Sequence, residues 1–73
     1  MIELRFKERL RELRKQNKLT QKVLSLEANV SEDCISDWER GKSEPSLQDL
    51  MKLAITLNTT IDYLVGKDNI EIN

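Results

Sequence analysis

The sequence predicts an all-α chain, a compact bundle of about five helices. Only two glycines and one proline occur among its 73 residues, so few positions can interrupt a helix. Apolar residues recur three and four positions apart, and Ser or Thr precedes four of the five apolar segments, where it can cap a helix. No strand pattern competes before the tail "KDNIEIN", which alternates only weakly.

The first helix is expected from about Glu3 to Gln16. Phe6, Leu10 and Leu13 are spaced at i, i+4 and i+7, with Ile2 one turn earlier, which places all four on one face. The polar segment "NKLT" ends this pattern.

Two short helices should follow. Thr20 can cap a helix that begins at Gln21, and Asn29 is suited to the left-handed residue at its end. Ser31 can cap the next helix, which Gly41 terminates. Ile35 and Trp38, three residues apart, should face the core from that helix.

A loop, "KSEP", leads to a fourth helix capped by Ser46, with Asp49 placed for a capping box. Its expected apolar stripe consists of Leu47, Leu50, Leu53, Ala54 and Leu57. Thr60 can cap a fifth, short helix, which Gly66 closes.

Composition excludes several classes of function. With one cysteine and no histidine, an internal disulfide, a zinc site of the usual Cys/His ligands and a Ser–His or Cys–His catalytic pair are all excluded. We therefore expect no enzyme, metal or cofactor, and no small-molecule ligand is evident. No apolar run is long enough for a membrane span, so a cytoplasmic protein with a reduced thiol is expected. Cys34 is expected to be a small filler side chain.

The charge is distributed unevenly along the chain. Residues 1–20 carry seven bases and three acids, whereas residues 21–50 carry three bases and seven acids. The net charge of the whole chain is −1. A general nucleic-acid binder would usually be strongly basic, so any DNA binding should depend on particular residues.

Several motifs in order resemble the lambda-repressor-like helix-turn-helix family, also called the Cro/repressor or XRE type. They are "LRELRKQNKLTQ", a small residue at Ser25, "VS" at the start of the third helix, "WERGKSEPSL" and "LAITLNTTIDYLVG". The resemblance extends from Phe6 to Gly66. It implies a helix-turn-helix DNA-binding domain over residues 1–67, with helices two and three forming the motif and 68–73 as a frayed or dimer-associated tail.

The resemblance also implies roles for individual residues. The third helix would enter the major groove of double-stranded DNA, with Glu32, Asp33, Ser36 and Asp37 contacting bases. Phosphates would be contacted by Thr20, Gln21, Lys22, Ser31, Arg40, Lys42 and Ser43. Arg14 and Glu39 match a family pair that forms an internal ion pair.

The acids on the third helix depart from the family pattern and leave three interpretations open. A carboxylate can accept a hydrogen bond from cytosine N4. Glu32 and Asp33 can instead stabilise the first turn of the helix against its dipole, although this does not explain Asp37. Finally, the acids can repel phosphates, in which case the fold would serve as a protein-interaction module with weak or lost DNA binding.

The expected function is a small transcriptional regulator acting as a homodimer on an inverted repeat, because one module makes few contacts. Ile61, Leu64 and Val65 are the expected dimer contacts. A regulatory protein partner is also possible, and Val23 and Leu26 are expected to be partly exposed. The sequence does not distinguish a phage repressor, a restriction–modification controller and an antitoxin-like regulator.

Overall fold

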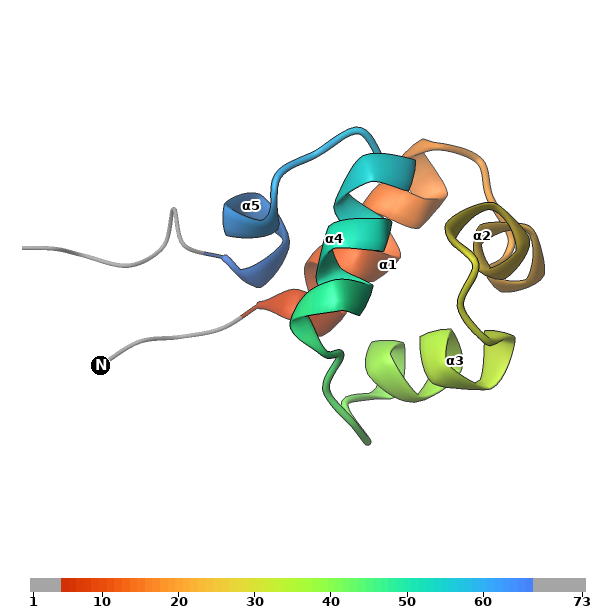
Figure 1. Ribbon diagram of the computed structural model, residues 1–73, viewed down its shortest axis with the longest axis horizontal. Coiled ribbons are helices and arrows are strands. Elements are labelled where there is room, and N and C mark those ends of the chain that lie inside the picture. Colours follow the sequence, from red (N-terminus) through yellow and green to blue (C-terminus); the bar gives the residue numbers. More distant parts are fainter. Residues whose placement is uncertain (1–4, 67–73) are drawn as a thin grey trace, which may run out of the picture.

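The computed structural model describes residues 5–66, and within this range the chain forms helices joined by turns, without strands (Figure 1). The all-α prediction is confirmed. The helices of this part of the chain are α1 (Phe6–Gln16), α2 (Gln21–Ala28), α3 (Glu32–Arg40), α4 (Leu47–Thr56) and α5 (Ile61–Val65). None of them is long and apolar enough to cross a membrane.

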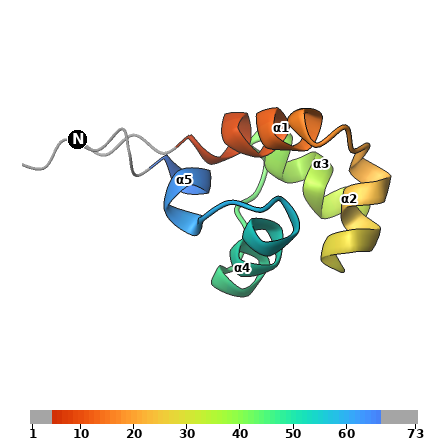
Figure 2. The same cartoon turned by 90° about the horizontal axis from the view of Figure 1, so that it is seen from above.

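The helices close into a ring of contacts in which each one packs against two others. α1 packs against α3 and α5, α2 packs against α3 and α4, and α4 packs against α5 (Figure 2). Each helix contributes one fully buried side chain to the core, namely Leu10, Leu24, Ile35, Leu53 and Leu64. Burying such a side chain contributes about 1.5–3 kcal/mol, so every helix is anchored by its own apolar residue.

Hydroxyl caps define where four of the helices begin. Thr20, Ser31, Ser46 and Thr60 each accept a hydrogen bond from the backbone N–H three residues later, at 3.0–3.1 Å. The Asp49 carboxylate also accepts from the backbone N–H of Ser46, which completes the predicted capping box. These four predicted starts are confirmed.

The predicted helix ends at Asn29, Gly41 and Gly66 are also confirmed. All three residues adopt the left-handed conformation, with φ of 57°, 74° and 84°. Because this conformation is unfavourable for most L-residues, Asn and Gly at these positions stop each helix and turn the chain.

The start of α1 differs from the prediction. We expected a helix from about Glu3, but α1 begins at Phe6, and Arg5 precedes it in a non-helical conformation. The Arg5 backbone N–H donates to the carbonyl of Val65 at 3.1 Å, which ties this residue to the end of α5. Glu3 and Ile2 lie outside the described residues, as does the predicted tail 68–73.

The core position of Trp38 is confirmed, with 3% of the residue exposed. Its indole ring meets the ring of Phe6 edge-on, with centroids 6.3 Å apart. Edge-on aromatic pairs contribute about 0.5–1.5 kcal/mol beyond their buried area. This contact fixes α3 against α1 and therefore determines which face of α3 remains in solvent.

Candidate nucleic-acid interface

Helices α2 and α3 form a tight helix-turn-helix unit. Their connection spans only residues 29–31, and the Val30 N–H donates to the Ser25 carbonyl at 3.1 Å. Ser25 is buried, and its hydroxyl donates to the Lys22 carbonyl at 2.6 Å. A small side chain with a satisfied hydroxyl lets α2 pack closely against its neighbours, so the two helices are held as one rigid element.

The residues predicted to contact bases lie together on one face of α3. Glu32 and Asp33 are exposed in its first turn, and Ser36 and Asp37 follow one turn later, half-buried. The spacing i, i+1, i+4 and i+5 places them on a common face. That face is opposite the buried pair of Ile35 and Trp38, so packing holds it toward solvent.

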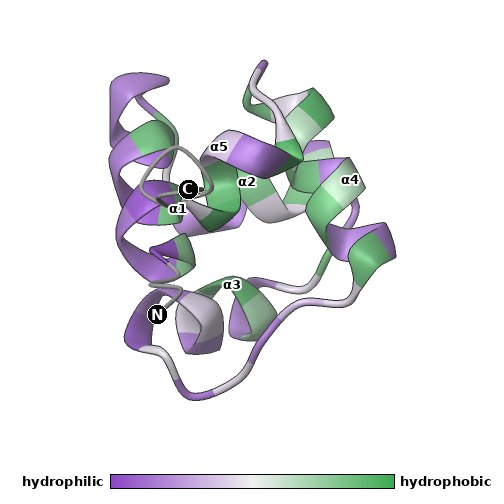
Figure 3. Cartoon of the chain, turned by 90° about the vertical axis from the view of Figure 1, so that its left-hand side faces the viewer, coloured by the Kyte–Doolittle hydropathy of each residue, from purple (hydrophilic) through white to green (hydrophobic). Residues whose placement is uncertain are grey.

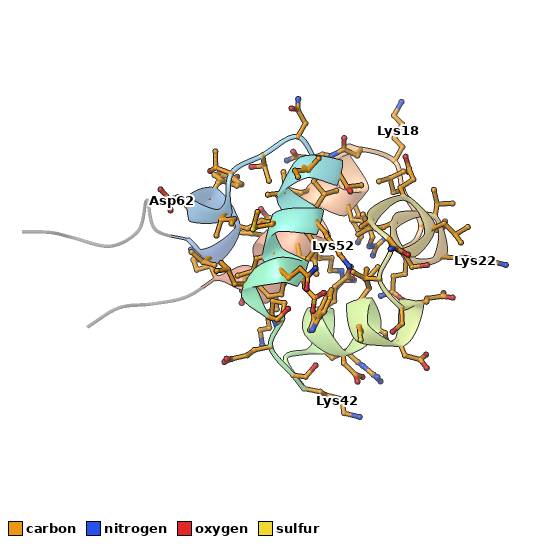
Figure 4. All side chains as sticks on the ribbon, viewed as in Figure 1. Lys18, Lys22, Lys42, Lys52 and Asp62 are labelled. Atoms are coloured by element: carbon orange, nitrogen blue, oxygen red, sulfur yellow. The ribbon has the colours of Figure 1, made fainter. Side chains whose placement is uncertain are left out.

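Two lysines predicted to contact phosphates lie at the sides of this face. Lys22 projects from α2, and Lys42 projects from the loop after α3, both away from the body of the molecule (Figure 4). Ser43 is exposed beside Lys42. By contrast, Lys18 projects from the side opposite α3, so its charge is directed away from this surface (Figure 4).

An ion pair joins Asp37, a predicted base contact, to Arg40, a predicted phosphate contact. Arg40 Nη2 lies 2.8 Å from Asp37 Oδ1, and the side chains are 60% and 38% exposed. Such an exposed pair contributes only about 0–1 kcal/mol, so Arg40 can exchange Asp37 for another anion at little cost. The pair also neutralises one of the three acids on the α3 face.

A second, largely buried ion pair connects α1 to the end of α3. Arg14 Nε donates to Glu39 Oε2 at 2.7 Å and Nη2 donates to Oε1 at 3.0 Å, a two-point contact between a guanidinium and a carboxylate. Arg14 also donates to the Leu19 carbonyl at 2.9 Å. The side chains are only 13% and 6% exposed, so the predicted pair of Arg14 and Glu39 lies within the folded chain.

The hydrogen bonds that Arg14 donates to Glu39 raise the pKa of Arg14, burial lowers it, and the negative charge of Glu39 raises it further. Gln21 belongs to the same cluster, because its amide nitrogen donates to Glu39 Oε1 at 3.3 Å. The first residue of α2 is therefore oriented by the carboxylate that holds α1 and α3 together.

The structure corrects three sequence-based expectations about exposed and buried residues. Leu64 was expected at a dimer contact, but it is fully buried in the core, whereas Ile61 and Val65 are half-buried. Leu47 was assigned to the same apolar stripe of α4 as the core residues Leu53 and Ala54, yet it is 67% exposed. Cys34 was expected to be a small filler, yet it is an exposed free thiol.

Sequence reasoning also missed a second apolar stripe on α4. Leu47, Met51 and Ile55 are 67%, 50% and 78% exposed and are spaced four residues apart, so they line one side of the helix. The sequence contains this i, i+4, i+8 spacing. It was not recognised because the neighbouring core residues of α4 are also apolar, so the sequence alone does not separate the exposed stripe from the buried one.

Comparison with known proteins places this arrangement among helix-turn-helix proteins. The helix-turn-helix family model matches residues 10–64. The transcriptional regulator ImmR of Bacillus subtilis is 36% identical over 62 residues, which cover 85% of this chain and 49% of ImmR. The repressor protein C2 of Salmonella phage P22 is 38% identical over 66 residues, which cover 90% of this chain and 31% of C2. The chain thus spans half or less of the length of these relatives.

Two solved structures superpose closely on the described helices. The restriction–modification controller C.AhdI of Aeromonas hydrophila has a TM-score of 0.77 at 34% identity, covering 81% of this chain and 89% of that protein. The P22 c2 repressor in complex with a synthetic operator has a TM-score of 0.79 at 38% identity, covering 82% of this chain and 91% of that chain.

Proposed function

We propose that this chain, which belongs to the helix-turn-helix family, binds double-stranded DNA in a sequence-specific manner and regulates transcription. The observation that carries the proposal is the polar face of α3. Its four side chains are held toward solvent by the buried pair Ile35 and Trp38 on the opposite face. A rigid helix with a polar outer face can enter the major groove, which admits an α-helix.

In this proposal the residues on the α3 face contact base edges. Glu32, Asp33 and Asp37 offer carboxylate oxygens, which are acceptors suited to the N4 amino group of cytosine, and Ser36 can both donate and accept. A good pairing of this kind discriminates between bases by about 1–3 kcal/mol. Acids at these positions would also reject base edges that present only acceptors.

Residues around this face contact phosphates, which position the helix without specifying sequence. The backbone N–H groups at the start of α2 and the amide of Gln21, oriented by Glu39, favour an anion. Thr20 and Ser31 use hydroxyl oxygens as cap acceptors, which leaves their protons to donate to phosphate. The remaining phosphate contacts are Lys22, Arg40, Lys42 and Ser43.

The acids should make binding selective, whereas the phosphate contacts should make it sensitive to salt. Phosphate contacts dominate affinity for DNA. The salt slope, which is the steepness with which affinity falls as the salt concentration rises, becomes smaller with each phosphate contact that is lost. Three carboxylates on the docking face repel phosphates when the helix is not aligned with acceptable bases. Low affinity for unrelated duplexes is therefore the expected consequence, with affinity concentrated on few sequences.

We further propose that the protein acts as a homodimer on an inverted repeat, with the two α3 helices in successive major grooves. A single α3 has only four side chains that can contact bases in this proposal, which are few contacts for a specific site. A twofold pair doubles these contacts and requires an operator with matching symmetry.

A second candidate function is favoured by one observation, the exposure of Glu32 and Asp33 at the start of α3. An acidic helix face of this kind could instead bind a basic surface of another protein. The family scaffold would then serve protein recognition, with DNA binding weakened or lost.

The test is selection of random-sequence duplexes by the purified chain at low salt, followed by affinity titrations across salt concentrations. Enrichment of a palindrome, with affinity that falls steeply as salt rises, supports the proposal. Asp37→Asn should then change which sequences are enriched, while Lys42→Ala weakens binding to all of them and reduces the salt slope by about 1. If no sequence is enriched and Asp37→Asn tightens binding to every duplex equally, the acids only repel DNA, and the second candidate is favoured.

A further inference from the structure

The described surface contains one apolar stripe that is free of charge. Leu47, Met51 and Ile55 line the outer side of α4 over about 12 Å of helix, and all three are exposed by half or more. In Figure 3, hydrophobic residues recur along α4 at the edge of the molecule. The largest apolar patch on the surface of a protein is often a site of interaction.

The two charged side chains of α4 are both engaged away from this stripe. The Asp49 carboxylate accepts from the Ser46 backbone in the capping box. Lys52 Nζ donates to the carbonyl of Asn29, at the end of α2, at 3.4 Å. Neither charge therefore interrupts the stripe.

We infer that this stripe is the surface through which two copies of the chain pair, an inference that rests on the homodimer of the proposed function. Two identical surfaces that meet about a twofold axis must be complementary to themselves. A charged patch would place like charges opposite each other across that axis, whereas an uncharged apolar stripe brings no like charges together. A second copy is therefore a better occupant than a partner that must be recruited by charge.

The exposed apolar residues of α2 do not share this property. Val23 and Leu26 on α2 are 41% and 71% exposed, but they lie between the exposed charged residues Lys22 and Glu27. Two apolar side chains flanked by opposite charges form a smaller and mixed surface. Leu26 thus provides a control position that matches Ile55 in exposure but not in surroundings.

The direction of α4 determines how the two copies would pair. α4 begins at the loop that follows α3 and runs away from the level of α3 toward the opposite side of the molecule (Figure 1). A twofold axis along α4 pairs the helices in parallel and presents both α3 helices at the same end of the dimer. Antiparallel pairing would place the two α3 helices at opposite ends, where a single duplex cannot contact both.

The area of the stripe predicts a weak pair. Three side chains of this size and exposure cover on the order of 300 Å², well below the roughly 800 Å² that each partner buries in a standard interface. The dimer should therefore dissociate readily in solution and form mainly when both copies occupy one operator. DNA binding would then rise steeply with protein concentration.

Single cysteines in a Cys34→Ser background test the pairing. Leu47→Cys, Met51→Cys and Ile55→Cys are oxidised with and without operator DNA, and Leu26→Cys serves as the matched control. Parallel pairing brings each α4 position close to its own copy, so all three should form disulfide-linked dimers well above the control. Cross-linking at Met51→Cys alone would indicate antiparallel helices and overturn the parallel arrangement, and yields no higher than at Leu26→Cys would overturn the interface itself.

A second measurement separates this inference from DNA binding. Ile55→Glu should weaken binding to a full inverted repeat at least about 10-fold, because it opposes two like charges across the axis, and should leave binding to a single half-site unchanged. Leu26→Glu should leave both unchanged. Equal affinity of Ile55→Glu and the unaltered chain for the full repeat would refute the interface. If no duplex binds but the α4 cysteines still cross-link, the proposed function fails and the pairing stands.

Discussion

Replacing Glu39 by leucine should remove much of the stability of this fold. Glu39 accepts two hydrogen bonds from Arg14 and one from Gln21, and its side chain is only 6% exposed. Leucine fills a similar space but accepts no hydrogen bond. Arg14, which is 13% exposed, would keep its charge with only the Leu19 carbonyl as an acceptor.

The expected cost follows from leaving a nearly buried charge without its partner, which is about 3–5 kcal/mol. A chain of this length has a total stability of roughly 4–11 kcal/mol, at about 0.05–0.15 kcal/mol per residue. The substitution should therefore lower the melting temperature by at least about 12 °C, since each kcal/mol corresponds to about 4–8 °C in a small domain.

The assay is thermal and urea unfolding followed by helix ellipticity, with the fluorescence of the buried Trp38 as a second probe. Arg14→Met combined with Glu39→Leu should recover much of the loss, because removing both charges also removes their desolvation cost. Asp37→Asn is the control, since it breaks an exposed ion pair and should change stability by about 0–1 kcal/mol. The reasoning would be refuted if Glu39→Leu costs less than Asp37→Asn, or if the double variant is no more stable than Glu39→Leu.

Three further substitutions test local features of the structure. Ser46→Ala should lower the free energy of unfolding by about 0.5–2 kcal/mol, because α4 loses its cap, and an unchanged urea midpoint would contradict this. Gly41→Ala should cost at least about 1–2 kcal/mol in the same assay, since φ is 74° and the new Cβ would lie 3.3 Å from Lys7 Cδ; a neutral effect would show that the turn relaxes. Cys34 should react fully with a thiol reagent in the native state, and Cys34→Ser should leave the melting temperature unchanged; slow reaction would indicate a buried thiol.

Local sequence patterns predicted most of the helix boundaries, because caps and left-handed ends are made within a few residues. Thr20, Ser31 and Ser46 bond to backbone groups only three positions away, so spacing alone indicated their role. The burial of Ile35 and Trp38 was predictable for the same reason, since three-residue spacing places both on one side of a helix.

Several features that depend on contacts distant in sequence were not predicted. α1 begins late because the Arg5 backbone bonds to Val65 instead of extending the helix. Leu64 is buried because α1 and α4 both pack against α5, whereas Leu47 lies on α4 outside these contacts. Periodicity identifies an apolar face, but it does not indicate how wide a part of that face the neighbouring helices cover.

The ion pair of Arg14 and Glu39 was predicted from the resemblance, but two other side-chain bonds of the candidate interface were not. The resemblance placed Asp37 among base contacts and Arg40 among phosphate contacts, and it does not indicate the i, i+3 ion pair that joins them. The hydrogen bond from Gln21 to Glu39 joins α2 to α3 and required the fold itself. The contacts with DNA stay predictions that the selection and substitution experiments can test.

The hydrogen bond between Arg5 and Val65 has a consequence for engineering this fold. It holds Arg5, the first described residue, beside the end of α5 at one edge of the molecule, away from α3 (Figure 1). Closely spaced ends allow circular permutation, so a short linker from Gly66 to Arg5 and a new opening between α4 and α5 should preserve the unit of α2 and α3. For the same reason, a fluorescent reporter or a second binding module attached at this edge would extend away from α3.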